Sequence, residues 1–493
     1  MSTLAFELKQ QVVAWCCARS FASLRPKTGL EDSVTQLTQN FIVILSKPRS
    51  RDHGGPKSFL VTLMSIMATV HLTTAAELTW VSRSSYDTSL NGALGRHHPI
   101  TFANETHGFV ISGSTKTIGA VNDLHIYDEK SDVWTDASSA LSGQNFPART
   151  YSYGVVLDEV NHPKAYMGFG SDVSGNRLAD WWEFDMTTLQ FRQLATFPGA
   201  GRHHPSMVSV YSGEGAGWEI HVGLGDGLVG NLMEFSNFDD YWSYSVNNDR
   251  WIQLPNFPSS QRHHPYYFGI DGVSYTGFGH SSSKIERDFY SYDGGMWTQE
   301  PDFESYSMSN ENNLVTTEAR VAGTQFSIVL PMRGSTDGGS GELSGAIGFV
   351  LSGDGDDHRT MYEGEFHAFY PNAAKKWRTL PPHPGESRWA PGSFVMRGTA
   401  RVYFTSGYEH STGKLYSDVW AIDLSSLFRT TDSSPAMTDV AVSTTDSTSS
   451  SPTVPVSQTT DMMSDGDVEG SSGALMTTMP TRYVAVILLC LYF

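Results

Sequence analysis

A short hydrophobic segment that ends in glycine recurs six times along the chain. The segments read FVISG, YMGFG, HVGLG, YTGFG, FVLSG and YFTSG, and they end at Gly113, Gly170, Gly225, Gly279, Gly353 and Gly407. After each glycine an acidic residue leads an aromatic-rich stretch, at Asp123, Asp180, Asp240, Asp288, Glu365 and Asp418. Hydrophobic and polar positions alternate in these stretches, which predicts β-strands separated by glycine turns.

An arginine precedes each hydrophobic segment, and a fourth element that usually carries Trp closes each unit. The arginines are Arg96, Arg149, Arg202, Arg262, Arg320 and Arg388, spaced by 53 to 68 residues. The closing residues are Trp134, Phe191, Trp251, Trp297 and Trp377. Four strands in about fifty residues are typical of one propeller blade. The pattern therefore predicts an all-β, six-bladed β-propeller over residues 77–428.

The sixth unit has no closing strand of its own, because after Leu424 the chain becomes rich in Ser and Thr. The segment Leu78-Thr79-Trp80-Val81 precedes Arg96 at nearly the same spacing at which Trp134 precedes Arg149. We therefore expect this N-terminal segment to supply the outermost strand of the last blade. Such pairing closes the ring and covers a strand edge.

In these features the chain resembles the kelch-repeat family of β-propellers. The resemblance rests on the glycine-ended second strand, the acidic-aromatic third strand and the Trp-bearing fourth strand, and it covers about residues 78–428. The paired glycines of the family appear here as Gly-x-Gly or Ser-Gly, and the fifth unit is stretched. The resemblance implies that ligands bind at the propeller face where the loops before the first strand and after the second strand emerge.

The repeated arginines and the residues after the glycines are expected at that same face, because both connections emerge at one end of an up-and-down sheet. Loops on a rigid scaffold are common binding sites. The candidate ligand-binding residues are Arg96, Arg149, Arg202, Arg262, Arg320, Arg388, His98, His204 and His264. A ring of arginines would attract an anionic ligand, such as an acidic sugar or a protein carboxylate.

Three of these segments read Arg-His-His-Pro, starting at Arg96, Arg202 and Arg262. Imidazole suits Zn, Cu or Fe, and alternation along a strand lets at most one histidine of each pair face the channel. His97, His203 and His263 are weak metal candidates, and packing between blades is the favoured role of the histidines. We therefore expect neither a metal nor a cofactor.

The loop Gly353-Asp354-Gly355-Asp356-Asp357 carries three carboxylates, which suit Ca²⁺. The weak calcium candidates are Asp354, Asp356 and Asp357. Because the loop lacks the spacing of an EF-hand, a solvated acidic turn is favoured over a calcium site.

Composition excludes some classes of function. The net charge is 33 − 52 = −19, which argues against a nucleic-acid partner. The three cysteines are Cys16, Cys17 and Cys490, so no disulfide can staple the repeats. The kelch resemblance also implies a possible relation to enzymes of the galactose-oxidase type. These enzymes need a cysteine linked to their radical tyrosine, and because the repeats have no cysteine, this chemistry is excluded.

The two ends of the chain are interpreted as export and attachment signals. Residues 1–56 form an extension of unclear status, and 57–76 resemble a signal peptide around the apolar stretch at 59–72, with a buried strand or a signal anchor as alternatives. Residues 429–472 are a Ser/Thr-rich stalk. Residues 473–493 follow small residues around Ser472 and form a GPI-signal-like tail or a plain membrane tail. Asn104 begins a glycosylation sequon on a predicted hairpin.

These features lead us to expect a monomeric cell-surface binding or adhesion module, tethered to the membrane by its C-terminal tail, that recognises a protein or glycan ligand at the rim. The alternative is an extracellular enzyme, a sugar isomerase or lyase or a metal-dependent enzyme, that uses rim arginines and histidines. An intracellular kelch adaptor is disfavoured, because 56 residues are too few for the extra helical domain of such proteins.

Overall fold

The computed structural model describes residues 78–430 except 87–93, 117, 231–233, 336–342 and 362. The predicted extension 1–56, the signal-like segment 57–76 and the tail 473–493, together with Ser472, lie outside the described residues. Of the predicted stalk only Arg429–Thr430 is described, and it forms β36, which pairs with β28. Within the described ranges, no helix has the length and apolar character needed to cross a membrane.

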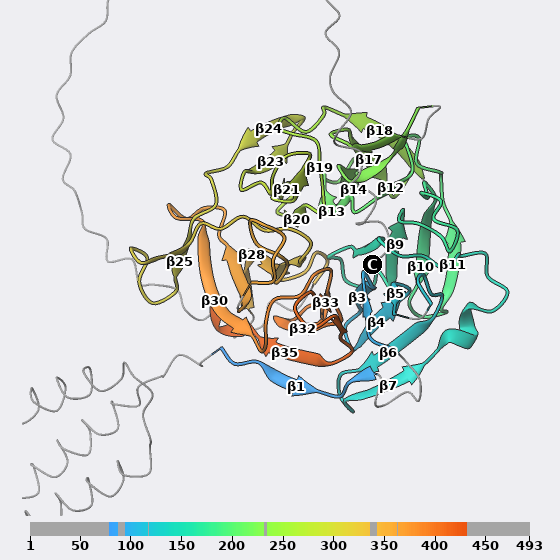
Figure 1. Cartoon of the computed structure of the whole chain (residues 1–493), viewed down its shortest axis with the longest axis horizontal. Helices are drawn as coiled ribbons and strands as arrows, with labels where there is room; N and C mark the ends of the chain where they lie inside the picture. The colour runs from blue at the N-terminus through green and yellow to red at the C-terminus, as the bar shows by residue number, and fades with distance from the viewer. Residues whose placement is uncertain are drawn as a thin grey trace, which may run out of the picture. The chain divides into compact units, whose positions relative to one another are not determined.

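The described part is all-β and consists of small antiparallel sheets that surround a common axis (Figure 1). Sheet 1 contains β3 (Ile100–Ala103), β4 (His107–Ile111), β6 (Leu124–Asp128) and β7 (Val133–Asp136), and sheet 2 contains β8 (Tyr153–Val156), β9 (Lys164–Gly168), β10 (Trp181–Asp185) and β11 (Gln190–Gln193). Sheet 3 contains β13 (Ser206–Tyr211), β14 (Trp218–Gly223), β17 (Tyr241–Ser245) and β18 (Arg250–Leu254), and sheet 4 contains β20 (Tyr266–Ile270), β21 (Val273–Gly277), β23 (Phe289–Asp293) and β24 (Met296–Gln299).

Sheets 5 and 6 depart from this simple order of strands. Sheet 5 contains β27 (Thr324–Leu330), β28 (Leu343–Leu351), β29 (Gly364–Phe369) and β30 (Trp377–His383), and sheet 6 contains β31 (Gly392–Val395), β32 (Arg401–Thr405), β35 (Val419–Asp423) and β1 (Val81–Arg83). The extra length before Arg320 forms β25 (Ser305–Ser307) and β26 (Leu314–Thr316). β25 lies parallel to β30 and widens sheet 5 at its outer edge.

Each sheet is joined to the next by a backbone hydrogen bond at an equivalent place. The amide of the glycine after each second strand donates to the carbonyl of the arginine that precedes the next sheet. The six bonds are Gly113 to Arg149 (3.0 Å), Gly170 to Arg202 (2.8 Å), Gly225 to Arg262 (2.9 Å), Gly279 to Arg320 (3.1 Å), Gly353 to Arg388 (3.0 Å) and Gly407 to Arg96 (2.8 Å). The last bond returns from sheet 6 to sheet 1, so the six links close on themselves. This arrangement is compatible with a β-propeller.

The glycine at each link is required by the geometry of the turn. At Gly225 φ is +90°, and a Cβ there would lie 2.3 Å from the carbonyl oxygen of His203. The preceding residue, Leu224, also has a positive φ of 57°. Two consecutive residues in the left-handed region turn the chain sharply out of the second strand, and only glycine fits the second position.

The N-terminal segment supplies the outer strand of sheet 6. Val81 pairs with Ala421, and Arg83 pairs with Val419, in antiparallel register. Figure 1 shows β1 lying along the outer edge of β35. Trp80 packs on Phe366 and Phe404, and its indole N–H donates to the carbonyl of Pro381 at 3.0 Å. The pairing expected from the sequence is therefore present, and it places both ends of the repeat region in one sheet.

A buried histidine beside Trp80 makes stability depend on pH. The Nε2 atom of His383 lies 3.0 Å from the Ser352 hydroxyl, and its ring stacks near that of Phe404. Burial, with the charge of Arg388, lowers the pKa of His383 to about 3 from its ordinary value of 6.5. Between these two values the unfolded chain binds a proton that the folded chain does not, so stability falls as the pH falls.

We expect His383→Gln to remove this contribution. Between pH 6 and pH 4 the free energy of unfolding of the native chain should fall faster than that of the variant, by about 1.4 kcal/mol per pH unit. Denaturant unfolding at several pH values measures both slopes. Equal slopes for the two proteins would show that His383 is protonated in the folded state.

Candidate functional site

The six repeated arginines lie inside the sheets. Each is buried and pairs with the acidic residue that leads the third strand of the same sheet. The pairs are Arg96–Asp123 (2.6 Å), Arg149–Asp180 (2.6 Å), Arg202–Asp240 (2.6 Å), Arg262–Asp288 (2.5 Å), Arg320–Glu365 (2.9 Å) and Arg388–Asp418 (2.7 Å). The two most regular features of the sequence are therefore partners of one another.

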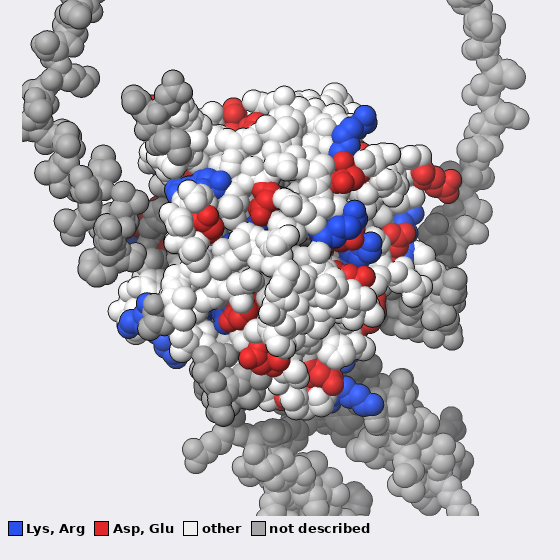
Figure 2. All heavy atoms as spheres, turned by 90° about the vertical axis from the view of Figure 1, so that its right-hand side faces the viewer, with Lys and Arg blue, Asp and Glu red and all other residues white. Residues whose placement is uncertain are grey.

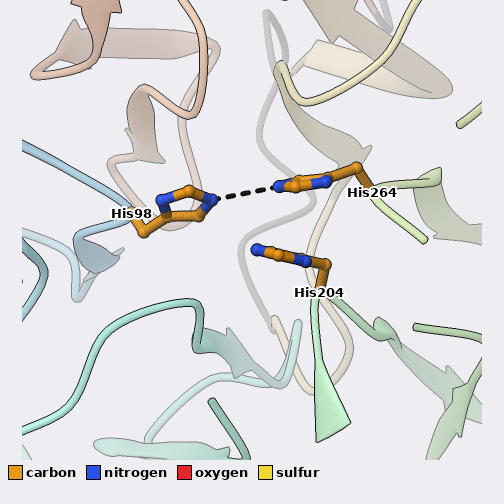
Figure 3. A group of neighbouring side chains, drawn as sticks. All are labelled: His98, His204 and His264. Atoms are coloured by element: carbon orange, nitrogen blue, oxygen red, sulfur yellow. Dashed lines mark hydrogen bonds between the residues drawn. The ribbon is translucent and has the colours of Figure 1, made fainter. Parts of the chain in front are cut away.

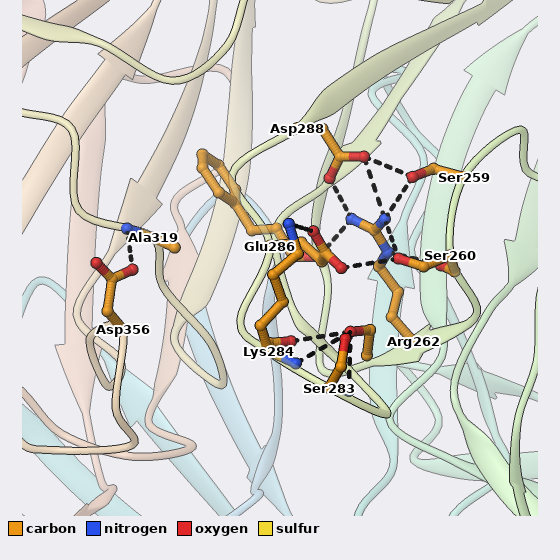
Figure 4. A network of polar contacts seen from close by, with 11 residues as sticks. Ser259, Ser260, Arg262, Ser283, Lys284, Glu286, Asp288, Ala319 and Asp356 are labelled. Atoms are coloured by element: carbon orange, nitrogen blue, oxygen red, sulfur yellow. Dashed lines mark hydrogen bonds and ion pairs between the residues drawn. The ribbon is translucent and has the colours of Figure 1, made fainter.

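Sheet 4 shows how closely such an arginine is held (Figure 4). The guanidinium of Arg262 donates to both carboxylate oxygens of Asp288 and to the hydroxyls of Ser259 and Ser260. It also donates to the carbonyl oxygen of Phe278 at 3.2 Å. Burial alone would raise the pKa of Asp288, but the hydrogen bonds and charge of Arg262 outweigh it and hold that pKa below its usual value.

This burial bears on the anion-binding role predicted for the arginines. Their guanidinium groups are inaccessible and already hold carboxylates, so the structure gives that prediction no support. The physical reason is that a carboxylate at the start of the third strand reaches the arginine across the sheet, which only the folded chain brings about. The arginines link strands within each sheet.

The residue two places after each arginine has a left-handed backbone in all six sheets. These residues are His98 (φ 50°), Tyr151 (φ 60°), His204 (φ 50°), His264 (φ 51°), Ala322 (φ 55°) and Ala390 (φ 47°). We call the six segments that begin at the arginines and end at these residues the arginine turns. A positive φ is unusual for residues other than glycine, and its recurrence here shows that the six turns share one backbone conformation.

The arginine turns and the loops after the second strands form one end of the molecule, as predicted. The middle residue of each turn pairs with the residue that follows the glycine of the same sheet. The pairs are His97–Ser114, Thr150–Ser171, His203–Asp226, His263–His280, Val321–Asp354 and Trp389–Tyr408. We call this end of the molecule the histidine face.

Three histidines meet at the centre of the histidine face (Figure 3). The Nε2 atoms of His98 and His264 are 3.1 Å apart, and the rings of His204 and His264 stack with centroids 3.4 Å apart. All three side chains are buried. Tyr151 and Trp389 pack edge-on against His98, with centroids 4.6 and 4.5 Å away. The sequence did not single out these two aromatic residues.

The first histidine of each pair surrounds this central group. His97 lies with its Nδ1 2.7 Å from that of His98, and His263 bonds the amide oxygen of Asn237 at 2.9 Å. His203 lies beside Asp226, with 3.7 Å between its Nδ1 and a carboxylate oxygen. The three weak metal candidates therefore flank the cluster, and the second histidines form its centre.

The surroundings of the central histidines disfavour their charged form. Burial lowers the pKa of His98, His204 and His264 well below the ordinary value, and neighbouring imidazoles lower it further. Burial likewise lowers the pKa of His97, His203 and His263 to about 4. A neutral imidazole offers one lone pair, which is what a hydrogen-bond donor or a metal ion requires.

The loop with Asp354, Asp356 and Asp357 was expected to be a solvated acidic turn and was only a weak calcium candidate. Its carboxylates have different partners, and Asp354 is not solvated. Asp354 is buried and lies 3.1 Å from the Nε2 atom of His410. Asp356 accepts a hydrogen bond from the amide of Ala319, and Asp357 pairs with Arg359 (Figure 4 shows the Asp356 contact). The structure does not gather these three residues around one point.

Three neighbouring loops of the histidine face carry exposed apolar side chains. Ile118 of sheet 1 is 61% exposed, Val173 of sheet 2 is 73% exposed and Phe235 of sheet 3 is 61% exposed. Phe235 lies on β16 (Glu234–Asn237), with its ring centroid 6.4 Å from that of His263. Ile118 and Val173 belong to loops, and Phe235 lies on a short strand outside the repeated pattern, so the patterns of the repeated strands gave no signal for these residues.

The innermost strands enclose a cavity of about 150 Å³. All six sheets line it, through Thr101, Tyr153, Met207, Tyr267, Gln325 and Ser393. Pro99 and Pro391 also line it and directly follow two arginine turns, so the histidine cluster lies at this end of the cavity.

Asn104 lies in the hairpin between β3 and β4, where the sequence placed it. Its side-chain oxygen accepts hydrogen bonds from the amides of Thr106 and His107. Figure 2 shows another side of the molecule, on which acidic and basic side chains are interspersed.

Comparison of the chain with models of known protein families and with curated proteins finds no match.

Proposed function

We propose that the chain is a six-bladed, kelch-like β-propeller, exported and held at the cell surface, that binds a protein ligand on its histidine face. The observation that carries the proposal is the group of exposed apolar side chains at Ile118, Val173 and Phe235. They come from consecutive sheets and from the connections that emerge on the histidine face. A protein ligand that covers this face would bury all three apolar side chains.

The scaffold beneath these loops supports a binding role. The six glycine links and the six buried ion pairs hold the loops at fixed positions around the axis. A preorganised surface loses little entropy on binding. On this face the buried histidines lie at the end of the cavity between the inner strands.

The enzyme alternative has less support than binding. It relied on arginines and histidines at the rim as acid and base groups. The arginines are buried in ion pairs, and the central histidines are buried too. The three apolar side chains favour a protein over a glycan, because none of them can form a hydrogen bond with a sugar hydroxyl.

The apolar loops can be tested on the chain as cells display it. The chain would be released from producing cells with a phospholipase that cleaves GPI anchors, labelled, and applied to arrays of surface proteins and of glycans. We expect binding to a protein that falls at least tenfold in the triple variant Ile118→Ser, Val173→Ser, Phe235→Ser, because most of the contact is apolar.

The matched control replaces three apolar side chains of similar exposure on outer strands, as Val133→Ser, Ile252→Ser, Met296→Ser. This variant should bind like the native chain. Equal losses in both variants would contradict the proposed face, and a signal on glycans alone would contradict the protein ligand. Chain that no phospholipase releases would favour a plain membrane tail over a GPI anchor.

A further inference from the structure

The central histidines bring three possible ligand nitrogens close together. One ligand nitrogen from each of His98, His204 and His264 falls within 4.8 Å of the other two. Figure 3 shows the three rings entering from separate turns with nitrogens directed toward a common region. We propose that His98, His204 and His264 together bind one divalent transition-metal ion of the Zn²⁺ class.

The orientation of His204 supplies independent support. Its Nδ1 lies 2.8 Å from a carboxylate oxygen of Asp226, whereas its Nε2 is buried and has no hydrogen-bond partner. When Nδ1–H donates to the carboxylate, the lone pair of Nε2 is left unused inside the protein. Buried polar atoms are rarely left without a partner. A carboxylate that orients a histidine whose other nitrogen binds a metal is a common arrangement around zinc.

The distance between His98 and His264 suits two ligands of one ion. Two nitrogens bound to one tetrahedral Zn²⁺ lie ~3.3 Å apart, from Zn–N distances of about 2.0–2.1 Å. The Nε2 atoms of His98 and His264 are 3.1 Å apart. The contact between the Nδ1 atoms of His97 and His98 is satisfied when that of His98 carries the proton, which leaves its Nε2 lone pair for the ion.

The chemistry of the donor atoms narrows the class of cation. An all-imidazole set suits Zn²⁺, Cu²⁺ or Ni²⁺ and disfavours Ca²⁺ or Mg²⁺, which prefer oxygen. Tyr151 and Trp389 pack against the imidazole of His98, and an ion here would tie together sheets 1, 3 and 4. The metal site and the ligand-binding loops involve different side chains, so either can exist without the other.

Calorimetric titration of the full chain with Zn²⁺, after removal of metals by a chelator, tests the site. We expect one equivalent of Zn²⁺ to bind and to raise the thermal midpoint. His204→Gln should weaken binding at least 100-fold, and Asp226→Asn should weaken it about 10- to 100-fold, as loss of an orienting carboxylate does. The matched control is His410→Gln, which changes a half-exposed histidine of the same face and should bind Zn²⁺ like the native chain.

Co²⁺ in place of Zn²⁺ tests the native chain without any substitution. Four-coordinate cobalt bound by nitrogen absorbs visible light strongly, and we expect that spectrum at one equivalent. The proposal is overturned if the folded, metal-free chain takes up no stoichiometric Zn²⁺, if only the weak spectrum of hydrated cobalt appears, or if His410→Gln abolishes binding that His204→Gln leaves intact.

Discussion

Replacing Arg202 by methionine should lower the free energy of unfolding by about 3–5 kcal/mol, the usual cost of removing one partner from a buried ion pair. Arg202 is 0% exposed, and its guanidinium donates to both carboxylate oxygens of Asp240 and to the carbonyl of Leu224. The substitution keeps an apolar side chain in the space but leaves the Asp240 carboxylate without its cation. Denaturant unfolding monitored by tryptophan fluorescence measures the loss.

Two controls separate the buried pair from a general effect of losing an arginine. Arg359→Met removes a guanidinium that is 83% exposed and pairs with Asp357, so it should change stability by less than about 1 kcal/mol. Adding Asp240→Asn to Arg202→Met should recover part of the loss, because no unpaired buried charge remains. If the double variant is less stable than Arg202→Met by the full cost of a second substitution, the pairing does not carry the effect.

Trp80→Ala should lower the free energy of unfolding by about 3–5 kcal/mol, as truncation of a large buried aromatic side chain does. Trp80 is 9% exposed and packs on Phe366 and Phe404 between sheets 5 and 6. Its loss opens a cavity and weakens the attachment of β1 to β35. Because β1 joins the start of the repeats to the end, the effect should appear as earlier unfolding of the entire repeat region.

Val81→Ala is the matched control, because Val81 is the next residue and its side chain is 50% exposed. It should change stability by less than about 0.5 kcal/mol. A loss as large as that of Trp80→Ala would mean that strand pairing, and not the buried indole, holds the N-terminal segment. An unchanged stability of Trp80→Ala would mean that the packing of this indole contributes little to holding β1 on sheet 6.

The sequence alone was sufficient for the strands, the turns and their repetition. The alternation of side chains along a strand and the glycine at a left-handed turn are local properties, so they can be recognised from the sequence alone. The pairing of β1 with β35 could also be predicted, because a missing strand at one end matched a spare strand at the other. The common end for the arginine turns and the second-strand loops followed from the order of strands in one sheet.

The environment of each side chain was decided only by the tertiary structure. Arg202 and Asp240 are far apart in sequence, and their contact depends on how three strands lie beside one another. From the sequence alone we therefore expected the arginine to contact a ligand, whereas in the structure it pairs with Asp240. The left-handed backbone of His98, His204 and His264 recurs at Tyr151 and at two alanines in the other turns, so the residue type does not indicate it. The alternation of side chains along an extended strand does not apply to residues in such a turn. The sequence could therefore indicate that histidines gather at this face, but it could not indicate which histidine of each pair lies at the centre.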